Sequence, residues 1–177
     1  MNKKVLLIFA FFCMLNLQAQ EAETETETET ETTTYYLIRH AEKNRLNPSN
    51  ENPNLKEKGV DRAINWSKTF KHINFDYIFS TNYNRTIQTA LPTAKSKDLE
   101  IQFYNPNDLY NEDFKVLTTG KKILIVGHSN TTPQFVNKIL GQEKYPEMDD
   151  RNNADLYIIT ISENNKSDIL LNIEIKK

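Results

Sequence analysis

Two histidines and an arginine stand directly after short runs of strand-forming residues. Arg39 and His40 follow the β-favouring residues 35–38, and His128 lies just beyond the apolar residues 123–126. Burying a guanidinium beside an imidazole without partners is costly. We therefore expect these side chains at the open carboxyl ends of two strands, where open α/β sheets bind their ligands.

A second arginine can reach the same place. Arg85 lies in residues 80–90, just beyond another short strand. If the strands before His40 and His128 are parallel neighbours, both imidazoles lie on one rim of the sheet, and Gly127 allows close backbone approach there. The following helix adds N–H groups that favour an anion. Two arginines, two histidines and a helix N-terminus together predict a phosphate pocket.

The motifs that carry these residues resemble the signature of a known family. They are Arg39-His40-Ala41-Glu42, Ser80-Thr-x-x-x-Arg85-x-x-x-Thr89-Ala90 and Val126-Gly127-His128-Ser129-Asn130. In residue type and order they resemble the histidine phosphatase, or phosphoglycerate mutase-like, superfamily. The resemblance runs from about residue 35 to at least residue 140.

The resemblance implies a reaction. His40 would be the nucleophile, forming a phosphohistidine that water hydrolyses. Arg39, Arg85 and His128 would hold the phosphate oxygens, and the two arginines would lower the pKa of His40 and keep it neutral. The implied activity is a metal-independent phosphatase without a cofactor, acting on a phosphomonoester or phosphoramidate. The substrate would be a small phosphorylated molecule or a phosphorylated residue.

Two positions depart from the family pattern. Ala41 stands where the family commonly has Gly, as in the small phosphohistidine phosphatase branch. Leu46 stands six residues beyond the nucleophile, where the family often has Asn. Asn44 and Asn47 are near enough to replace it, and we expect Asn44 to bind phosphate.

The general acid that protonates the leaving oxygen has several candidates. In the mutase-like branch it is a Glu after the strand that follows the second arginine. Here Asp108 and Glu112 are the candidates, with Asp113 behind them, and we favour Asp108 because it lies just beyond the expected strand 101–104. If neither Asp108 nor Glu112 reaches the pocket rim, only substrates with good leaving groups should turn over. A phosphoramidate needs less help from a carboxylic acid than an alkyl ester does.

Two other functions compete with a phosphatase. One is a catalytically weak, exported phosphate-binding module of the same fold. The other, a phosphoglycerate mutase-type phosphotransferase, is disfavoured because mutases usually carry extra insertions around the substrate. Neither the composition nor the motifs indicate an oligomeric state.

The alternation of strand and helix patterns predicts a three-layer α/β/α sandwich with a mostly parallel central sheet. The last two strands form a hairpin that makes the C-terminal edge antiparallel. The expected strands are 35–38, 76–80, 101–104, 123–126, 154–161 and 169–175, with 169–175 in the core, and the expected helices are 55–71, 85–94, 107–117, capped by Asn107, and 132–140.

The chain divides into three parts. Residues 1–20 have two lysines, an apolar run and a short polar exit, the pattern of a secretory signal peptide, and the run is too short to span a membrane. Residues 21–34 alternate Glu and Thr without a cation, which favours a disordered linker. Residues 35–177 form one domain. We therefore expect an exported protein, periplasmic or extracellular, without a stable membrane span after cleavage.

The charge of the domain excludes one class of partner. The chain has 22 basic and 24 acidic residues, and two of the lysines and six of the glutamates precede residue 35. The domain therefore carries a net charge near +2, too mild for a nucleic-acid surface.

Overall fold

The computed structural model describes residues 31–163 and 165–175. Within them the chain forms one six-stranded sheet with strand order β3-β2-β4-β1-β5-β6. The strands are β1 (Thr32–Arg39), β2 (Tyr77–Ser80), β3 (Ile101–Phe103), β4 (Lys122–Gly127), β5 (Asp155–Ser162) and β6 (Asn165–Asn172), and the helices are α2 (Glu57–Thr69), α3 (Asn84–Lys97), α4 (Glu112–Thr118) and α5 (Thr131–Leu140).

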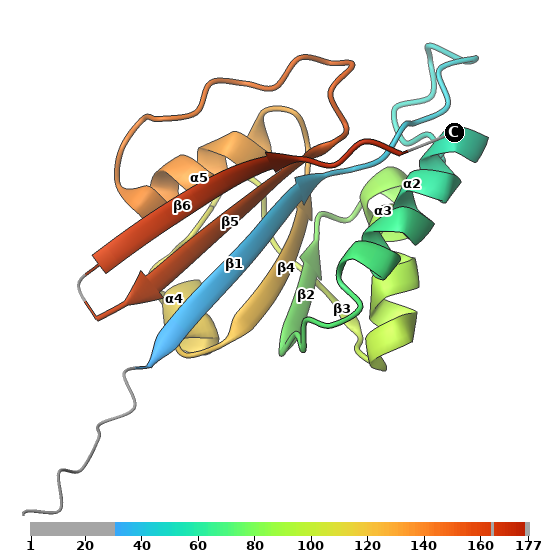
Figure 1. Ribbon diagram of the computed structural model, residues 1–177. Helices are drawn as coiled ribbons and strands as arrows, with labels where there is room; N and C mark the ends of the chain where they lie inside the picture. Colours follow the sequence, from blue (N-terminus) through green and yellow to red (C-terminus); the bar gives the residue numbers. More distant parts are fainter. Residues whose placement is uncertain (1–30, 164, 176–177) are drawn as a thin grey trace, which may run out of the picture.

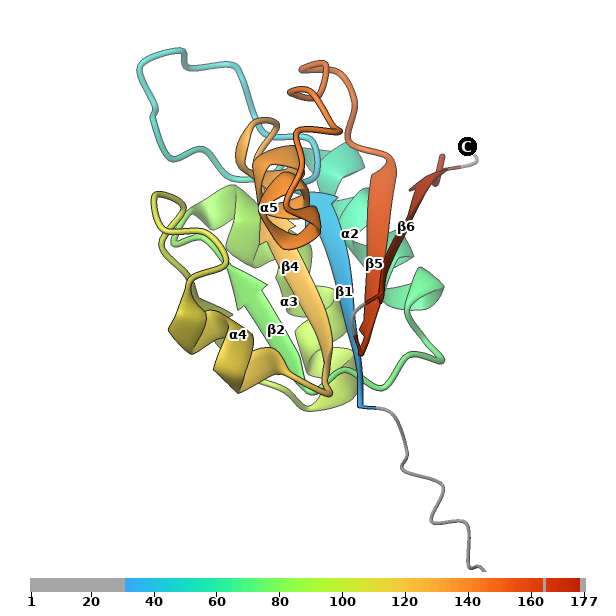
Figure 2. The same ribbon diagram turned by 90° about the vertical axis from the view of Figure 1, so that its left-hand side faces the viewer.

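The helices cover both faces of the sheet. Helices α2 and α3 pack together on one face, whereas α4 and α5 lie on the other (Figures 1 and 2). Strands β1 to β4 pair in parallel, and β5 and β6 pair antiparallel at one edge. This confirms the predicted α/β/α sandwich with an antiparallel C-terminal edge.

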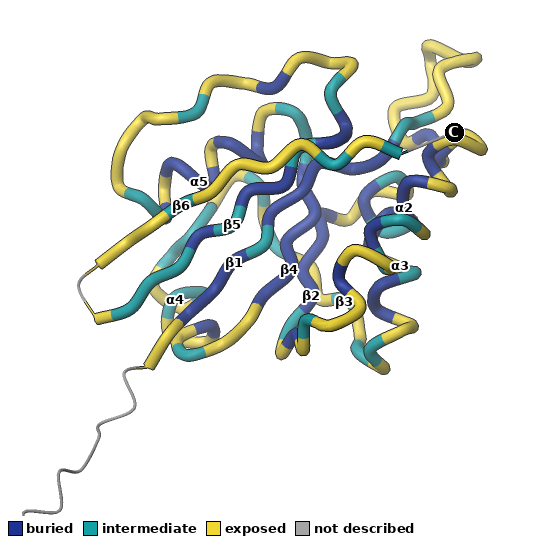
Figure 3. The backbone as a smooth tube through the Cα atoms, viewed as in Figure 1, coloured by how far each residue is buried: buried dark blue, intermediate teal, exposed yellow. Residues whose placement is uncertain are grey.

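Side-chain alternation along the central strands builds two cores. On β1, Tyr35 and Leu37 face α4 and α5, and Ile38 faces α2 and α3. Successive side chains of a strand point to opposite faces, so a strand covered on both sides is apolar at nearly every position. Burial on both faces also accounts for the continuous apolar run in β4. Buried residues accordingly concentrate in the middle strands (Figure 3).

Parallel pairing of β1 and β4 creates the rim that the sequence predicted. Arg39 pairs with Gly127 in this register, so His40 and His128 follow directly paired positions. The backbone N–H of His40 also donates to the carbonyl of Gly127, at 2.9 Å. The loop of residues 44–54 and the segment of residues 141–154 lie at the same end of the sheet (Figures 1 and 2).

Three expectations about the elements are wrong. Strand β1 begins at Thr32, so residues 32–34 belong to the sheet and not to a linker that ends at residue 34. Helix α4 is capped by Asn111, whose side chain accepts from the Phe114 N–H, and not by Asn107. Strand β6 is an exposed edge, with Ile169 56% exposed, because no helix covers it.

The signal peptide predicted for residues 1–20 and the linker residues before 31 lie outside the described residues. Within the described part of the chain, no helix is long and apolar enough to cross a membrane.

The early start of β1 predicts that a shortened chain loses stability. The Thr34 N–H donates to the Lys121 carbonyl, and the Thr33 hydroxyl accepts from the Gly120 N–H, both at 2.8 Å. Each such bond contributes about 1 kcal/mol, so a chain that begins at Tyr35 should be about 1–3 kcal/mol less stable than one that begins at Glu31. Urea unfolding of both chains checks this, and equal midpoints with equal slopes would contradict it.

Candidate active site

A cavity of about 340 Å³ opens at the rim where β1 and β4 end. It is lined by Arg39, His40, Lys43, Tyr83, Arg85, Pro106, Asn107, His128, Ser129, Asn130, Thr131 and Asp150. Four of the residues predicted to bind or attack phosphate, namely Arg39, His40, Arg85 and His128, thus meet in one place. We call this space the histidine cavity.

Two hydrogen bonds fix the orientation of His40. Its Nδ1 lies 2.7 Å from the carbonyl oxygen of Ala41, which can only accept, so Nδ1 carries the proton. The other ring nitrogen, Nε2, then has its lone pair free. The Asn153 side chain donates to the His40 carbonyl at 2.9 Å and holds the backbone from the other side. The imidazole is therefore in the tautomer that a nucleophile at Nε2 requires.

Burial and neighbouring cations keep both histidines neutral. The pKa of His40 is lowered to about 3, mainly by burial; the Ala41 carbonyl opposes this shift, and the charges of Arg39, His128 and Arg85 add to it. Burial, with Arg85 and Arg39 as the nearest charges, lowers the pKa of His128 to about 4. The two rings lie edge to face with centroids 5.5 Å apart. At neutral pH the site therefore presents two uncharged imidazoles between arginines.

His128 is oriented by a hydroxyl. Its Nε2 lies 2.8 Å from the Thr81 hydroxyl oxygen, which leaves Nδ1 without a partner among the residues described. The Tyr83 ring packs edge to face against it with centroids 5.1 Å apart. His128 can thus offer one nitrogen to a ligand.

Arg39 is almost completely buried and is held by the segment before β5. Its Nη1 donates to the carbonyl oxygens of Asp149 and Asn152, at 2.9 and 3.0 Å, and its Nη2 donates to the Asp150 carboxylate at 2.7 Å. A guanidinium has five N–H donors. The buried Nε–H has no partner among the described residues. Arg39 therefore combines a fixed orientation with a donor that lacks an acceptor.

Arg85, in the first turn of α3, repeats this pattern. Its guanidinium lies 4.5 Å from the centroid of the Tyr83 ring, and its Nη1 donates to the Glu51 carbonyl at 3.3 Å. Its buried Nε–H also lacks a partner within the described part of the chain. Buried N–H groups are rarely left unpaired. Two arginines that line one cavity, each with a donor that lacks an acceptor, fit an oxyanion with several acceptor oxygens, such as phosphate.

The Thr89 hydroxyl connects α3 to the nucleophile. It accepts from the Ala41 N–H at 2.9 Å and donates to the Arg85 carbonyl at 2.7 Å. Thr89 is fully buried, so this bond ties the residue after His40 to the helix that carries the second arginine. Thr89 and Thr81 both belong to the motif of residues 80–90.

Three residues predicted for the site lie elsewhere. Asp108 lines a separate cavity of about 300 Å³, where its carboxylate accepts from Asn111. Glu112 is exposed and paired with Lys115. The Asn44 side chain accepts from the Leu46 N–H and lines neither cavity beside His40.

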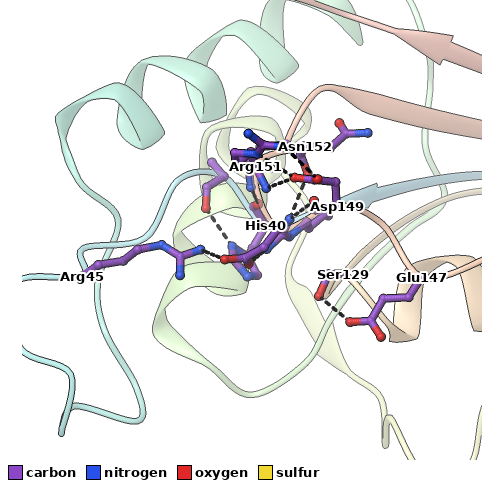
Figure 4. A network of polar contacts seen from close by, with 11 residues as sticks. His40, Arg45, Ser129, Glu147, Asp149, Arg151 and Asn152 are labelled. Carbon is purple, nitrogen blue, oxygen red and sulfur yellow. Dashed lines mark hydrogen bonds and ion pairs between the residues drawn. The ribbon is translucent and has the colours of Figure 1, made fainter.

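Two further charged residues line the cavity beside the predicted ones. Lys43 lines the histidine cavity, and so does Asp150, which pairs with Arg39 and with Arg45. Figure 4 shows Arg45 reaching from the loop after β1 towards the residues beside His40. Because Lys43 follows His40 by only three residues, its position in the sequence could have predicted that it lies at the cavity. Asp150 follows the nucleophile by 110 residues, and no local pattern marks it.

Among residues 31–163 and 165–175, no group of three or more His, Cys, Asp or Glu side chains is placed to hold a metal ion.

Comparison with known proteins finds a family similarity over part of the chain. Residues 35–105, a segment that contains Arg39, His40 and Arg85, match the family model of the histidine phosphatase superfamily (branch 1). No curated protein matches the chain.

Solved structures share the fold of this chain at low sequence identity. A candidate phosphohistidine phosphatase SixA from Agrobacterium tumefaciens is 18% identical, with a TM-score of 0.56, covering 78% of this chain and 97% of its own. A phosphoserine phosphatase variant from Entamoeba histolytica, solved with phosphoserine, is 15% identical, with a TM-score of 0.57 and coverage of 74% and 95%. A phosphoglycerate mutase from Bacillus anthracis is 16% identical, with a TM-score of 0.58 and coverage of 80% and 93%.

The Thr89 bond predicts a contrast between two buried threonines of α3. Thr89→Val leaves the buried Ala41 N–H unpaired and should lower the free energy of unfolding by about 1–3 kcal/mol. Thr93 is equally buried, but its hydroxyl has no partner among the described residues, so Thr93→Val should be neutral or stabilising. Urea unfolding of both variants measures the contrast, and equal losses would contradict it.

The lowered pKa values predict a loss of stability in acid. In the unfolded chain each histidine binds a proton below about pH 6.5, but in the folded chain only below about pH 3 for His40 and about pH 4 for His128. In between, the unfolded state binds more protons, so the free energy of unfolding falls as the pH falls from 6.5 towards 4. Thermal unfolding should show a smaller fall for the His40→Asn, His128→Asn double variant. Equal falls would contradict the prediction, because the carboxylates titrate in both proteins.

Proposed function

We propose that this protein is a metal-independent phosphatase that works through a phosphohistidine on His40. The proposal rests on the arrangement of three residues that line one cavity. His40 is neutral with its Nε2 free, and beside it the buried Nε–H donors of Arg39 and Arg85 have no partner among the described residues. A neutral imidazole can attack phosphorus, and the two donors can hold the oxygens of the phosphoryl group. The match of residues 35–105 to the histidine phosphatase superfamily model supports the same reaction.

The reaction has two steps. The His40 Nε2 lone pair attacks phosphorus, a P–N bond forms, and the bond from phosphorus to the leaving group breaks. Water then attacks the same phosphorus, the P–N bond breaks, and its electron pair returns to Nε2 as orthophosphate leaves. Arg39, Arg85 and His128 would stabilise the oxygens throughout, so these residues would do the work that a metal ion does in other phosphatases.

The carboxylates near the cavity favour substrates with easily released leaving groups. Neither Asp108 nor Glu112 lines the histidine cavity. Asp150 does, but hydrogen bonds from Arg45 and Arg39 lower its pKa and keep it ionised. Without a protonated carboxylic acid, the leaving group must depart as a stable anion or take its proton elsewhere. A phosphorylated imidazole can do so, because its second ring nitrogen accepts a proton from solvent.

One observation favours a second candidate function. The same lack of a poised acid is what a catalytically weak phosphate-binding module would show, since binding needs only the arginines and His128. A substrate that needs no general acid distinguishes the two functions, because only the phosphatase would turn it over efficiently.

We also propose that the protein is exported. The proposal rests on residues 1–20, where lysines near the start precede an apolar run and a short polar exit.

A leaving-group comparison tests the proposed reaction. A missing general acid costs about 10²–10⁴-fold, so the protein should hydrolyse p-nitrophenyl phosphate at least about a hundredfold faster than glycerol 2-phosphate. Turnover should survive EDTA and disappear in His40→Ala. The control His72→Ala, at an exposed histidine outside the cavity, should keep wild-type activity.

Three results would contradict the proposal. Loss of activity in EDTA would contradict the metal-free reaction, and activity in His40→Ala would contradict the nucleophile. No turnover of p-nitrophenyl phosphate, with phosphate still raising the melting temperature, would favour the phosphate-binding module.

A further inference from the structure

His40 also lines a second cavity. This cavity has a volume of about 420 Å³ and shares His40, Lys43 and Asp150 with the histidine cavity. Five cationic side chains line it, and we call this cluster the basic annex: Lys43, Arg45, Lys56, Lys58 and Arg151. Since His40 and Lys43 line both spaces, a ligand whose phosphoryl group is at His40 can extend directly into the annex.

The carboxylates of the annex do not neutralise it. Glu42 already receives two hydrogen bonds from the buried Arg62, both at 3.0 Å, and lies 3.6 Å from Lys58. The Asp150 carboxylate is shared between two arginines, Arg39 at 2.7 Å and Arg45 at 2.6 Å.

Arg151 pairs with Asp149 at 3.1 Å. The carboxylates of Glu42, Asp149 and Asp150 are thus surrounded by seven cationic side chains, namely the five of the basic annex together with Arg39 and Arg62. Among these residues positive charge is in excess.

Two annex lysines, Lys43 and Lys56, have no side-chain partner in the described part of the chain, and both line the same cavity. Lys43 forms an isolated antiparallel bridge with Leu55, and the Lys56 N–H donates to the Glu42 carbonyl at 2.9 Å. Leu55 is buried, which anchors this bridge. The bridge therefore holds the backbones of Lys43 and Lys56 close together at the cavity.

Lys43 is also crowded by charge of its own sign. Burial lowers the pKa of Lys43, and the charges of Arg45 and Arg85 lower it further. An anion in either cavity would relieve this repulsion. A position between the two cavities is where the departing half of a substrate would lie.

We propose that the basic annex binds a second anionic group of the substrate, a phosphoryl or carboxylate group on the leaving half, through Lys43 and Lys56. The preferred substrate is then a small molecule with two anionic groups. This inference rests on the proposed function, because the first group is the phosphoryl group that His40 attacks. The annex cations also stabilise negative charge on the leaving half, which partly offsets the missing acid.

Binding of two inhibitors to the full chain tests the annex. Orthophosphate has one phosphoryl group, whereas methylenebisphosphonate has two joined by a bond that cannot be hydrolysed. A well-placed charged contact is worth about 1.4 kcal/mol, so calorimetry at physiological salt should show methylenebisphosphonate binding about tenfold more tightly than orthophosphate. This preference should fall in Lys56→Gln and vanish in the Lys43→Gln, Lys56→Gln double variant.

A matched lysine provides the control. Lys95 is exposed in the last turn of α3 and lines neither cavity, so Lys95→Gln should keep the wild-type preference. Equal affinity of the wild-type chain for both inhibitors, or an unchanged preference in the double variant, would overturn the proposal. Hydrolysis of p-nitrophenyl phosphate is followed in the same samples. Turnover of p-nitrophenyl phosphate without the preference for methylenebisphosphonate would overturn the proposed role of the annex alone. The preference without turnover would overturn the proposed function and leave the annex as an anion-binding site.

Discussion

The site depends on placing two guanidinium groups beside two imidazoles, with the Asp150 carboxylate as the one acidic group among the residues that line the cavity. The charges of Arg39 and Arg85 favour an anion in this space, and they add to the burial that lowers the pKa values of His40 and His128. Under the proposed function, binding and nucleophilicity therefore have one cause, since the charge that would hold the phosphate oxygens also keeps the attacking nitrogen unprotonated. Burial strengthens both effects, because few water molecules can screen the charges.

Neutral polar groups support this arrangement of charges. Thr89 positions the residue after the nucleophile, Asn153 holds the His40 carbonyl, and Thr81 orients His128. Hydroxyl and amide groups can satisfy buried donors and acceptors without adding charge. A carboxylate in any of these positions would attract the arginines and reduce their affinity for phosphate. The frequent threonines of the motif thus follow from the electrostatics of the pocket.

Sequence reasoning succeeded where the signal was periodic or adjacent in the chain. The apolar runs of β1 and β4 predicted parallel neighbours, and that pairing was enough to bring His40 and His128 together. It failed where loops decide the orientation of a side chain. The Asn44 side chain bonds to the nearby Leu46 N–H, and Asp108 accepts from Asn111, so both are committed to local turns. Asp150 reaches the site only through its pairing with arginines far away in the sequence.

The bond between Arg39 and Asp150 looks at first like an obstacle to phosphate binding. The Asp150 side chain is 64% exposed, however, and it also pairs with Arg45, so a carboxylate displaced by a phosphate dianion would keep its contact with water and a second cation. The two bonds from Nη1 to backbone carbonyls would remain and would keep the guanidinium in place. Arg39 is therefore oriented by backbone carbonyls, whereas its charge is only weakly neutralised by the Asp150 carboxylate. Because different groups orient and neutralise it, Arg39 keeps its orientation when one anion replaces another, as each turnover of a phosphatase requires.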